Sequence, residues 1–139
     1  MVSTAHTGEK AVAGTVAGLI DLHETVTWRA KHLGVWQELT SVITEVEAPH
    51  YFVDELQKGA FKHFRHEHRL QYEDGRTHMT DVFDYTSPFG FLGKFVDWLF
   101  LKHYMTQLLI KRNESIKEFA ESDRWKDVLF VEKVRLPEI

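Results

Sequence analysis

The sequence contains no cysteine, and this absence removes three classes of chemistry at once. Without thiols the chain has no disulfide framework, no cysteine-ligated zinc and no cysteine nucleophile. No apolar run approaches the roughly 20 residues that a membrane-spanning helix needs, and residues 1–10 lack the apolar stretch of a signal peptide. We therefore expect a cytoplasmic protein without a membrane span.

The charge balance also lacks a basic surplus. With 17 basic and 21 acidic residues the formal net charge is −4, whereas domains that bind nucleic-acid phosphates usually carry a basic patch. Nucleic acid is therefore not an expected partner. Apolar residues, by contrast, are abundant: 43% of the chain is hydrophobic and 13% is aromatic. This composition excludes a disordered chain and predicts a single domain over residues 1–139 with a thick core, an apolar cavity or an interface.

Alternating apolar residues predict an antiparallel sheet over residues 10–87. Val26, Trp28 and Ala30 share one face of an expected strand, because successive side chains of a strand point to opposite faces. Asp74-Gly75 is the strongest hairpin signal, since both residue types tolerate the positive φ of a tight turn. Further strands are expected over residues 10–17, 36–46, 51–57, 61–73 and 76–86.

A long helix is expected after the sheet, over residues 88–122. Ser87-Pro88 suits a helix start, because proline is favoured at the first helical position. Apolar residues then recur at helical spacing without another proline, which predicts a helix about 50 Å long. Residues 125–139 return to strand-like alternation, so a further strand is expected in this tail.

Four motifs resemble the SRPBCC group, the START/Bet v 1-like proteins with a helix-grip fold. They are Gly59–His68, Met79–Tyr85, Ser87–Gly90 and Leu101–Met105. The resemblance covers residues 18–121 and is strongest to a bacterial ligand-binding subgroup of unassigned activity. It implies an α+β fold in which a curved antiparallel sheet wraps around one long C-terminal helix. It also implies a cavity between sheet and helix, which in the group binds lipids, sterols, hormones or polyketides.

The two ends of the chain depart from this group. Its members normally begin with a strand and two short helices, which have no counterpart ahead of residues 3–14 here. The extra C-terminal strand expected over residues 125–139 would then take the vacant place in the sheet, in its own subunit or in a neighbour. We therefore expect a non-standard topology or a strand-exchanged homodimer.

Polar residues inside the expected strands are the candidates for chemistry. His66 and His68 share a strand face and so resemble a metal chelate, but no further cupin-like ligand pattern accompanies them, so no metal is predicted. Asp81 stands between Met79 and Phe83 on a face that is otherwise apolar. A buried carboxylate needs a partner, and the two histidines are the candidates for it.

Other charged residues on these strands have a simpler interpretation. Arg65, Glu67 and Arg69 share the face opposite the two histidines. We expect this face to be solvated and to carry cross-strand ion pairs.

The expected site combines an aromatic lining with these few polar groups. An aromatic stripe is more often plain core, but in a helix-grip fold the core and the cavity wall are the same surfaces. The sequence therefore predicts binding of a hydrophobic small molecule, such as a lipid or polyketide, between sheet and helix. The predicted ligand-binding residues are Trp28, Phe64, His66, His68, Asp81, Phe83, Tyr85, Phe91, Phe95 and Trp98.

Two alternatives stay open at this point. In the first, Asp81 and a histidine perform the acid–base work of a polyketide cyclase or hydrolase on the same fold. In the second, the apolar helix start over residues 89–100 and the tail strand serve assembly of a dimer without a ligand. The chain has no Gly-x-Ser-x-Gly motif and no glycine-rich phosphate loop, so no catalytic residue and no cofactor is predicted.

Overall fold

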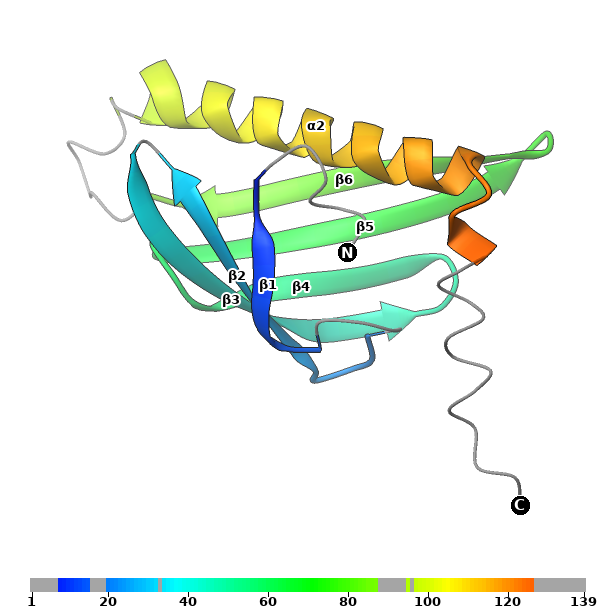
Figure 1. Ribbon diagram of the computed structural model, residues 1–139, viewed down its shortest axis with the longest axis horizontal. Coiled ribbons are helices and arrows are strands. Elements are labelled where there is room, and N and C mark those ends of the chain that lie inside the picture. The colour runs from blue at the N-terminus through cyan, green and yellow to red at the C-terminus, as the bar shows by residue number, and fades with distance from the viewer. Residues whose placement is uncertain (1–7, 16–19, 33, 88–94, 96, 127–139) are drawn as a thin grey trace.

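The computed structural model describes residues 8–15, 20–32, 34–87, 95 and 97–126, apart from the side chains of Asp97 and Trp98. These residues form a six-stranded antiparallel sheet followed by a helical segment (Figure 1). The helical segment is a π-helical turn η1, Asp97–Leu101, that leads directly into α2, Lys102–Glu121. The strands are β1 Lys10–Gly14, β2 Thr25–His32, β3 Val35–Glu47, β4 Tyr51–Lys58, β5 His63–Glu73 and β6 Arg76–Thr86.

The sheet is a meander in which each strand pairs with its neighbours in sequence, in the order β1-β2-β3-β4-β5-β6. The hairpin predicted at Asp74-Gly75 is confirmed, because Glu73 pairs with Arg76 and both turn residues have positive φ. The pairing of β5 with β6 on one side and with β4 on the other places polar residues of the three strands side by side. His66 lies opposite Asp54 on β4, and His68 lies opposite Asp81 on β6.

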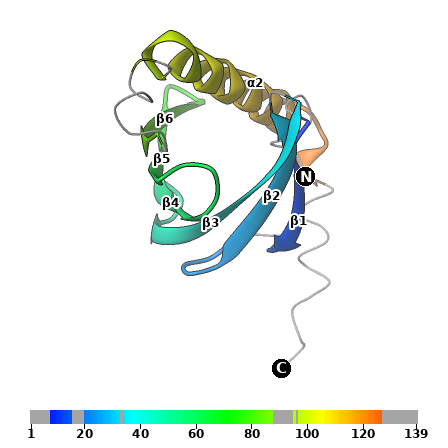
Figure 2. The same cartoon turned by 90° about the vertical axis from the view of Figure 1, so that its left-hand side faces the viewer.

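The sheet curves strongly, and α2 spans its open side from the β6 edge toward β1 and β2 (Figure 2). The register of β3 against β4 shifts twice, between Thr40 and Ser41 and between Ile43 and Glu45. Such bulges increase the local twist and bend of a strand, which contributes to the curvature of the sheet. The concave face carries buried core residues that include Val26, Ala30, Ile43 and Phe64.

The convex face carries the ion pairs that the sequence predicts there. Arg65 Nη2 lies 2.8 Å from Glu45 Oε1, and Arg65 also pairs with Glu67. Arg69 Nη2 lies 2.5 Å from Glu67 Oε2. The predicted cross-strand pairing is confirmed for Arg65, which pairs with Glu45 on β3, whereas Glu67 pairs with Arg65 and Arg69 within β5 and its side chain is only 16% exposed.

The topology expected at the two ends of the chain is wrong. The strand expected over residues 10–17 is present as β1 and holds the edge beside β2, and the sheet formed by the described residues includes no strand from the tail. Trp125 and Lys126, where the expected tail strand begins, are helical, and residues 127–139 lie outside the described residues. The physical reason is that, in a meander with short turns, each strand forms its backbone hydrogen bonds with the strands next to it in sequence. The sheet therefore needs no distant segment.

The expected helix over residues 88–122 also needs correction. Its described part comprises 5 residues of η1 and 20 of α2, with η1 wound more loosely than an α-helix. Residues 88–94 of the expected helix lie outside the described residues. Within the part of the chain that the structure describes, no helix combines the length and the apolar character needed to cross a bilayer.

Gly14 should be important for the docking of β1. Its φ is +79°, and a Cβ there would lie 2.1 Å from the carbonyl oxygen of Thr25. We expect Gly14→Ala to lower the free energy of unfolding by about 2–3 kcal/mol, since left-handed strain adds to the displacement of β1. Gly75→Ala is the matched control, with φ +77° and nothing within 4 Å of the new Cβ, and should cost only about 1 kcal/mol. Urea denaturation measures both losses, and equal losses would contradict a role for the Thr25 contact.

Candidate functional site

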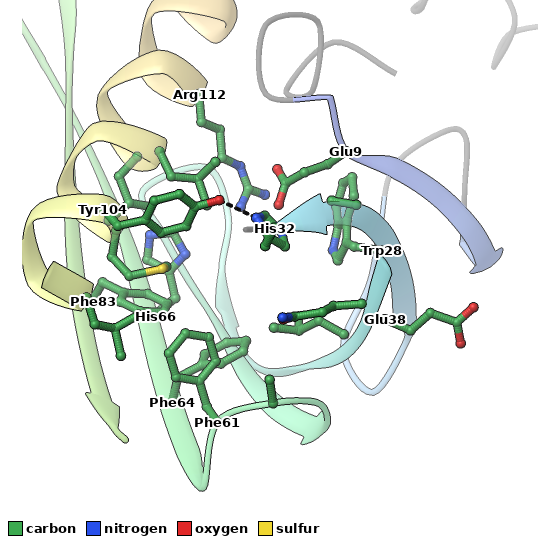
Figure 3. Close-up of a pocket in the computed structure, with 18 of the residues that line it drawn as sticks. Glu9, Trp28, His32, Glu38, Phe61, Phe64, His66, Phe83, Tyr104 and Arg112 are labelled. Atoms are coloured by element: carbon green, nitrogen blue, oxygen red, sulfur yellow. Dashed lines mark hydrogen bonds between the residues drawn. The ribbon is translucent and has the colours of Figure 1, made fainter. Parts of the chain in front are cut away.

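A cavity of about 280 Å³ lies between the concave face of the sheet and α2 (Figure 3). Aromatic residues on β2, β5 and β6 and in the loop before β5 form its sheet side, and leucine and methionine side chains of α2 form its helix side. The aromatic rings also pack on one another, with the Phe64 and Phe83 centroids 5.2 Å apart and those of Phe61 and Phe83 6.2 Å apart. This packing adds rigidity to the wall. The space is therefore bounded by ordered side chains on both sides.

Polar contacts to β2 hold α2 over this cavity. The Tyr104 hydroxyl forms a hydrogen bond with His32 Nδ1, and the two rings meet edge to face with centroids 5.8 Å apart. Further along α2, the Arg112 guanidinium lies over the Trp28 ring, 5.4 Å from its centroid. Burial, together with the charge of Glu9, raises the pKa of Tyr104, so its hydroxyl stays neutral at physiological pH.

A buried cluster of Asp54, His66, His68 and Asp81, here called the His–Asp cluster, adjoins the cavity. His66 is 2% exposed and His68 is 5% exposed. Their rings lie with centroids 4.0 Å apart, and Phe52 stacks on the outer face of His68 at 4.1 Å. The cluster meets the cavity through Asp54 and His66, which are part of the cavity wall.

Each carboxylate of the cluster faces one nitrogen from each imidazole. Asp54 Oδ1 lies 3.6 Å from His66 Nδ1 and 3.0 Å from His68 Nε2. Asp81 Oδ1 lies 3.5 Å from His66 Nε2 and 2.8 Å from His68 Nδ1. His66 Nε2 and both Asp81 oxygens are nevertheless buried without a well-aligned hydrogen bond. Buried polar atoms without aligned partners cost free energy, and Asn113 on α2 is a further polar neighbour of Asp81.

Burial and charge shift the pKa values within the cluster in opposite directions. Burial lowers the pKa of His66 and outweighs the attraction of the nearby carboxylates. Burial also opposes protonation of His68, but its interactions with Asp54 and Asp81 prevail and raise its pKa. Burial disfavours the charged carboxylates, yet their histidine partners hold the pKa values of Asp54 and Asp81 below the usual range. Both carboxylates are therefore ionised at neutral pH.

Four of the residues predicted to bind a ligand lie in the cavity wall. They are Trp28 on β2, Phe64 and His66 on β5, and Phe83 on β6. Strand alternation brings Phe64 and His66 to the same face, and the β5–β6 register places Phe83 opposite His66. The sequence pattern was sufficient to find this part of the wall.

Other predicted residues occupy different places. His68 and Asp81 belong to the His–Asp cluster and do not line the cavity, and Tyr85 packs on Phe61 and Phe83 beside it. Phe95 is 65% exposed and is not part of the described wall. Phe91 and the side chain of Trp98 lie outside the described residues.

Sequence reasoning missed Asp54 and Arg112. Asp54 shares a face of β4 with the apolar Phe52 and Leu56. An acidic residue on this otherwise apolar face was the available signal. Arg112 follows Met105 and Leu108 at helical spacing on the apolar stripe of α2, and a charge on such a stripe was the second signal.

These elements define an α+β protein in which one C-terminal helix spans the open side of a curved six-stranded antiparallel sheet. Among solved structures the chain is similar to TTHA0849 from Thermus thermophilus, with a TM-score of 0.64 and 13% identity, covering 82% of this chain and 76% of that one. At this identity the likeness shows the fold alone. No protein-family model and no curated protein matches the sequence. Membership of the SRPBCC group stays a prediction from the sequence motifs.

Proposed function

We propose that this protein binds a small, mainly apolar molecule in the cavity between the sheet and α2. The observation that carries the proposal is the cavity itself, about 280 Å³ in volume and walled largely by aromatic and aliphatic side chains. Small-molecule sites typically enclose about 300–1,000 Å³, so this volume suits a compact ligand such as a bicyclic ring or a short acyl chain. An apolar void without an occupant destabilises a core, which favours a space kept for a ligand.

Polar groups at the wall would orient this ligand. The wall includes Arg112, His66 and Asp54 and the hydrogen-bonded pair of His32 and Tyr104. Burial of apolar ligand surface would supply affinity at about 25 cal/mol per Å². The resemblance of the sequence motifs to the SRPBCC group, whose members bind hydrophobic ligands in this place, supports the same proposal.

The geometry gives less support to a cyclase or hydrolase that uses Asp81 and a histidine. Asp81 Oδ1 and His68 Nδ1 are within hydrogen-bond distance at 2.8 Å, but neither residue lines the cavity. A general acid or base has to reach the proton it transfers, directly or through one water. We therefore propose binding and assign no catalytic residue.

Filling the cavity should weaken ligand binding without unfolding the protein. Ala30 lines the cavity and is 3% exposed, so Ala30→Leu places a branched side chain in the space that the ligand would occupy. We expect at least a tenfold weaker affinity for 2-naphthol, a compact apolar probe, in isothermal titration calorimetry. Lys31→Leu is the matched control, because Lys31 is exposed and points to the other face of β2.

Native mass spectrometry of the purified protein provides a second test of the same proposal. A non-covalent adduct of a few hundred daltons that is lost in Ala30→Leu and kept in Lys31→Leu would support it. A wild-type protein that carries no adduct and does not bind 2-naphthol would contradict it.

A further inference from the structure

We propose that Asp54, His66 and His68 form a binding site for one divalent transition-metal ion, with Asp81 orienting the two imidazoles from the opposite side. This site goes beyond the proposed binding of an apolar molecule, and it is tested without any organic ligand. Three observations carry it: the donor set, the placement of Asp81, and the contact of the cluster with the cavity.

The donor set has the composition and spacing of a metal site. Two histidines at i and i+2 on β5 point to the same face, and Asp54 comes from the adjacent strand directly opposite His66. One donor atom from each of the three residues lies within 4.8 Å of the others. Asp54 Oδ1 is 3.6 Å from His66 Nδ1 and 3.0 Å from His68 Nε2. Neighbouring ligands of a tetrahedral zinc ion lie about 3.3 Å apart, so small side-chain rotations suffice to close the site.

Asp81 has the position of the outer carboxylate that metal-ligating histidines commonly require. The second ring nitrogen of such a histidine carries the proton and donates a hydrogen bond to a carboxylate, which fixes the tautomer and aims the free nitrogen at the metal. Asp81 Oδ1 lies 2.8 Å from His68 Nδ1 and 3.5 Å from His66 Nε2, the two nitrogens that face away from Asp54. Both Asp81 oxygens and His66 Nε2 are buried without an aligned hydrogen bond. Rotation of the rings onto a metal would align their outer nitrogens with Asp81, which also has Asn113 of α2 as a polar neighbour.

The surroundings leave open coordination positions on one side only. Asp54 and His66 belong to the cavity wall, so an ion bound between them would face the cavity. Phe52 stacks on His68 and closes the other side. Two carboxylates outweigh the positive charge of Arg112, the cation that acts on Asp54 and His66 from α2. The two imidazole donors favour zinc, copper, iron or nickel over magnesium or calcium.

Direct metal titration of the full chain tests this site. Tag-free protein is freed of metal with EDTA, dialysed, and titrated with Zn²⁺ by calorimetry and with Co²⁺ by visible absorption. We expect one tightly bound ion per chain and the ligand-field bands of a low-coordinate Co²⁺ ion. His66→Gln and His68→Gln should each weaken Zn²⁺ binding at least 100-fold, and Asp81→Asn should weaken it about 10–100-fold as an outer-shell loss.

Matched controls separate this site from surface binding. The chain has nine histidines, and His78→Gln removes an exposed one on β6 that should leave affinity and stoichiometry unchanged. Circular dichroism identifies any variant that fails to fold, and the wild-type titration remains decisive in that case. Absence of a stoichiometric site in the folded wild-type protein would overturn the proposal. Binding that survives in folded His66→Gln and His68→Gln would overturn it as well, while leaving the small-molecule proposal unaffected.

Discussion

Phe64→Ala should lower the free energy of unfolding by about 3–5 kcal/mol, the range for removing a large aromatic side chain from a core. Phe64 is 3% exposed on β5, and its ring packs on Phe61 and on Phe83, with centroids 6.2 and 5.2 Å away. Truncation to alanine removes these contacts and enlarges an existing cavity that the surrounding strands cannot close. Urea or thermal denaturation followed by circular dichroism measures the loss.

Tyr72→Ala provides the matched control for this variant. Tyr72 is an aromatic residue on the same face of β5, but it is 71% exposed. Its removal should change the stability by no more than about 0.5 kcal/mol. Phe64→Leu, which keeps most of the apolar volume, should lose less than about 1.5 kcal/mol and remains measurable if Phe64→Ala does not fold. Similar losses for Phe64→Ala and Tyr72→Ala would show that the cavity wall does not contribute to the core.

The strands were predictable from sequence where the signal is local. The strand predicted over residues 76–86 has the same bounds as β6, because strict alternation and an Asp-Gly turn fix it within a few residues. Periodicity was less informative for β3, where Trp36 is 66% exposed although it is the largest apolar residue of its strand. An alternating pattern with apolar residues on both faces does not show which face is buried, and two bulges shift the register of β3 against β4 further.

The His–Asp cluster was predictable only within one hairpin. His66, His68 and Asp81 follow from the parity of β5 and β6 and from the turn between them. Asp54 lies on β4, and its pairing with His66 depends on the connection before β5, which no local rule specifies. Arg112 reaches the cavity only because α2 crosses the concave face, a tertiary arrangement. Local patterns thus identified His66, one of the two cluster residues that line the cavity, but they identified neither Asp54 nor Arg112.

A double-mutant cycle at His68 and Asp81 should reveal strong coupling in metal-free protein. Both side chains are less than a tenth exposed, and His68 Nδ1 lies 2.8 Å from Asp81 Oδ1. His68→Leu leaves the Asp81 carboxylate buried beside a single histidine, and breaking a buried ion pair from one side typically costs about 3–5 kcal/mol. Asp81→Leu removes one of the two carboxylates that stabilise His68 and should also be destabilising. The double variant His68→Leu/Asp81→Leu removes the Asp81 charge together with its partner and should recover that part of the loss, although Asp54 Oδ1, 3.0 Å from His68 Nε2, also loses a partner.

An exposed pair with the same kind of geometry is the control for this cycle. Arg29 Nη2 lies 2.5 Å from Glu38 Oε1 across β2 and β3, but both side chains are about half exposed, at 54% and 51%. Replacing either or both by leucine should give a coupling free energy below about 1 kcal/mol. Urea denaturation of both sets in EDTA measures the two couplings side by side. Additive losses at His68 and Asp81 would contradict the paired arrangement described here.

A double variant as stable as the wild type would bear on why the His–Asp cluster exists. A core that is equally stable with two leucines gains nothing from a buried histidine and a carboxylate whose oxygens lack aligned partners. Retention of such groups beside a cavity is then best explained by what they bind. The same variant should lose Zn²⁺ binding, because it lacks one ligand and the carboxylate that orients the other histidine. Stability retained and metal binding lost together would separate a functional role of the cluster from a structural one.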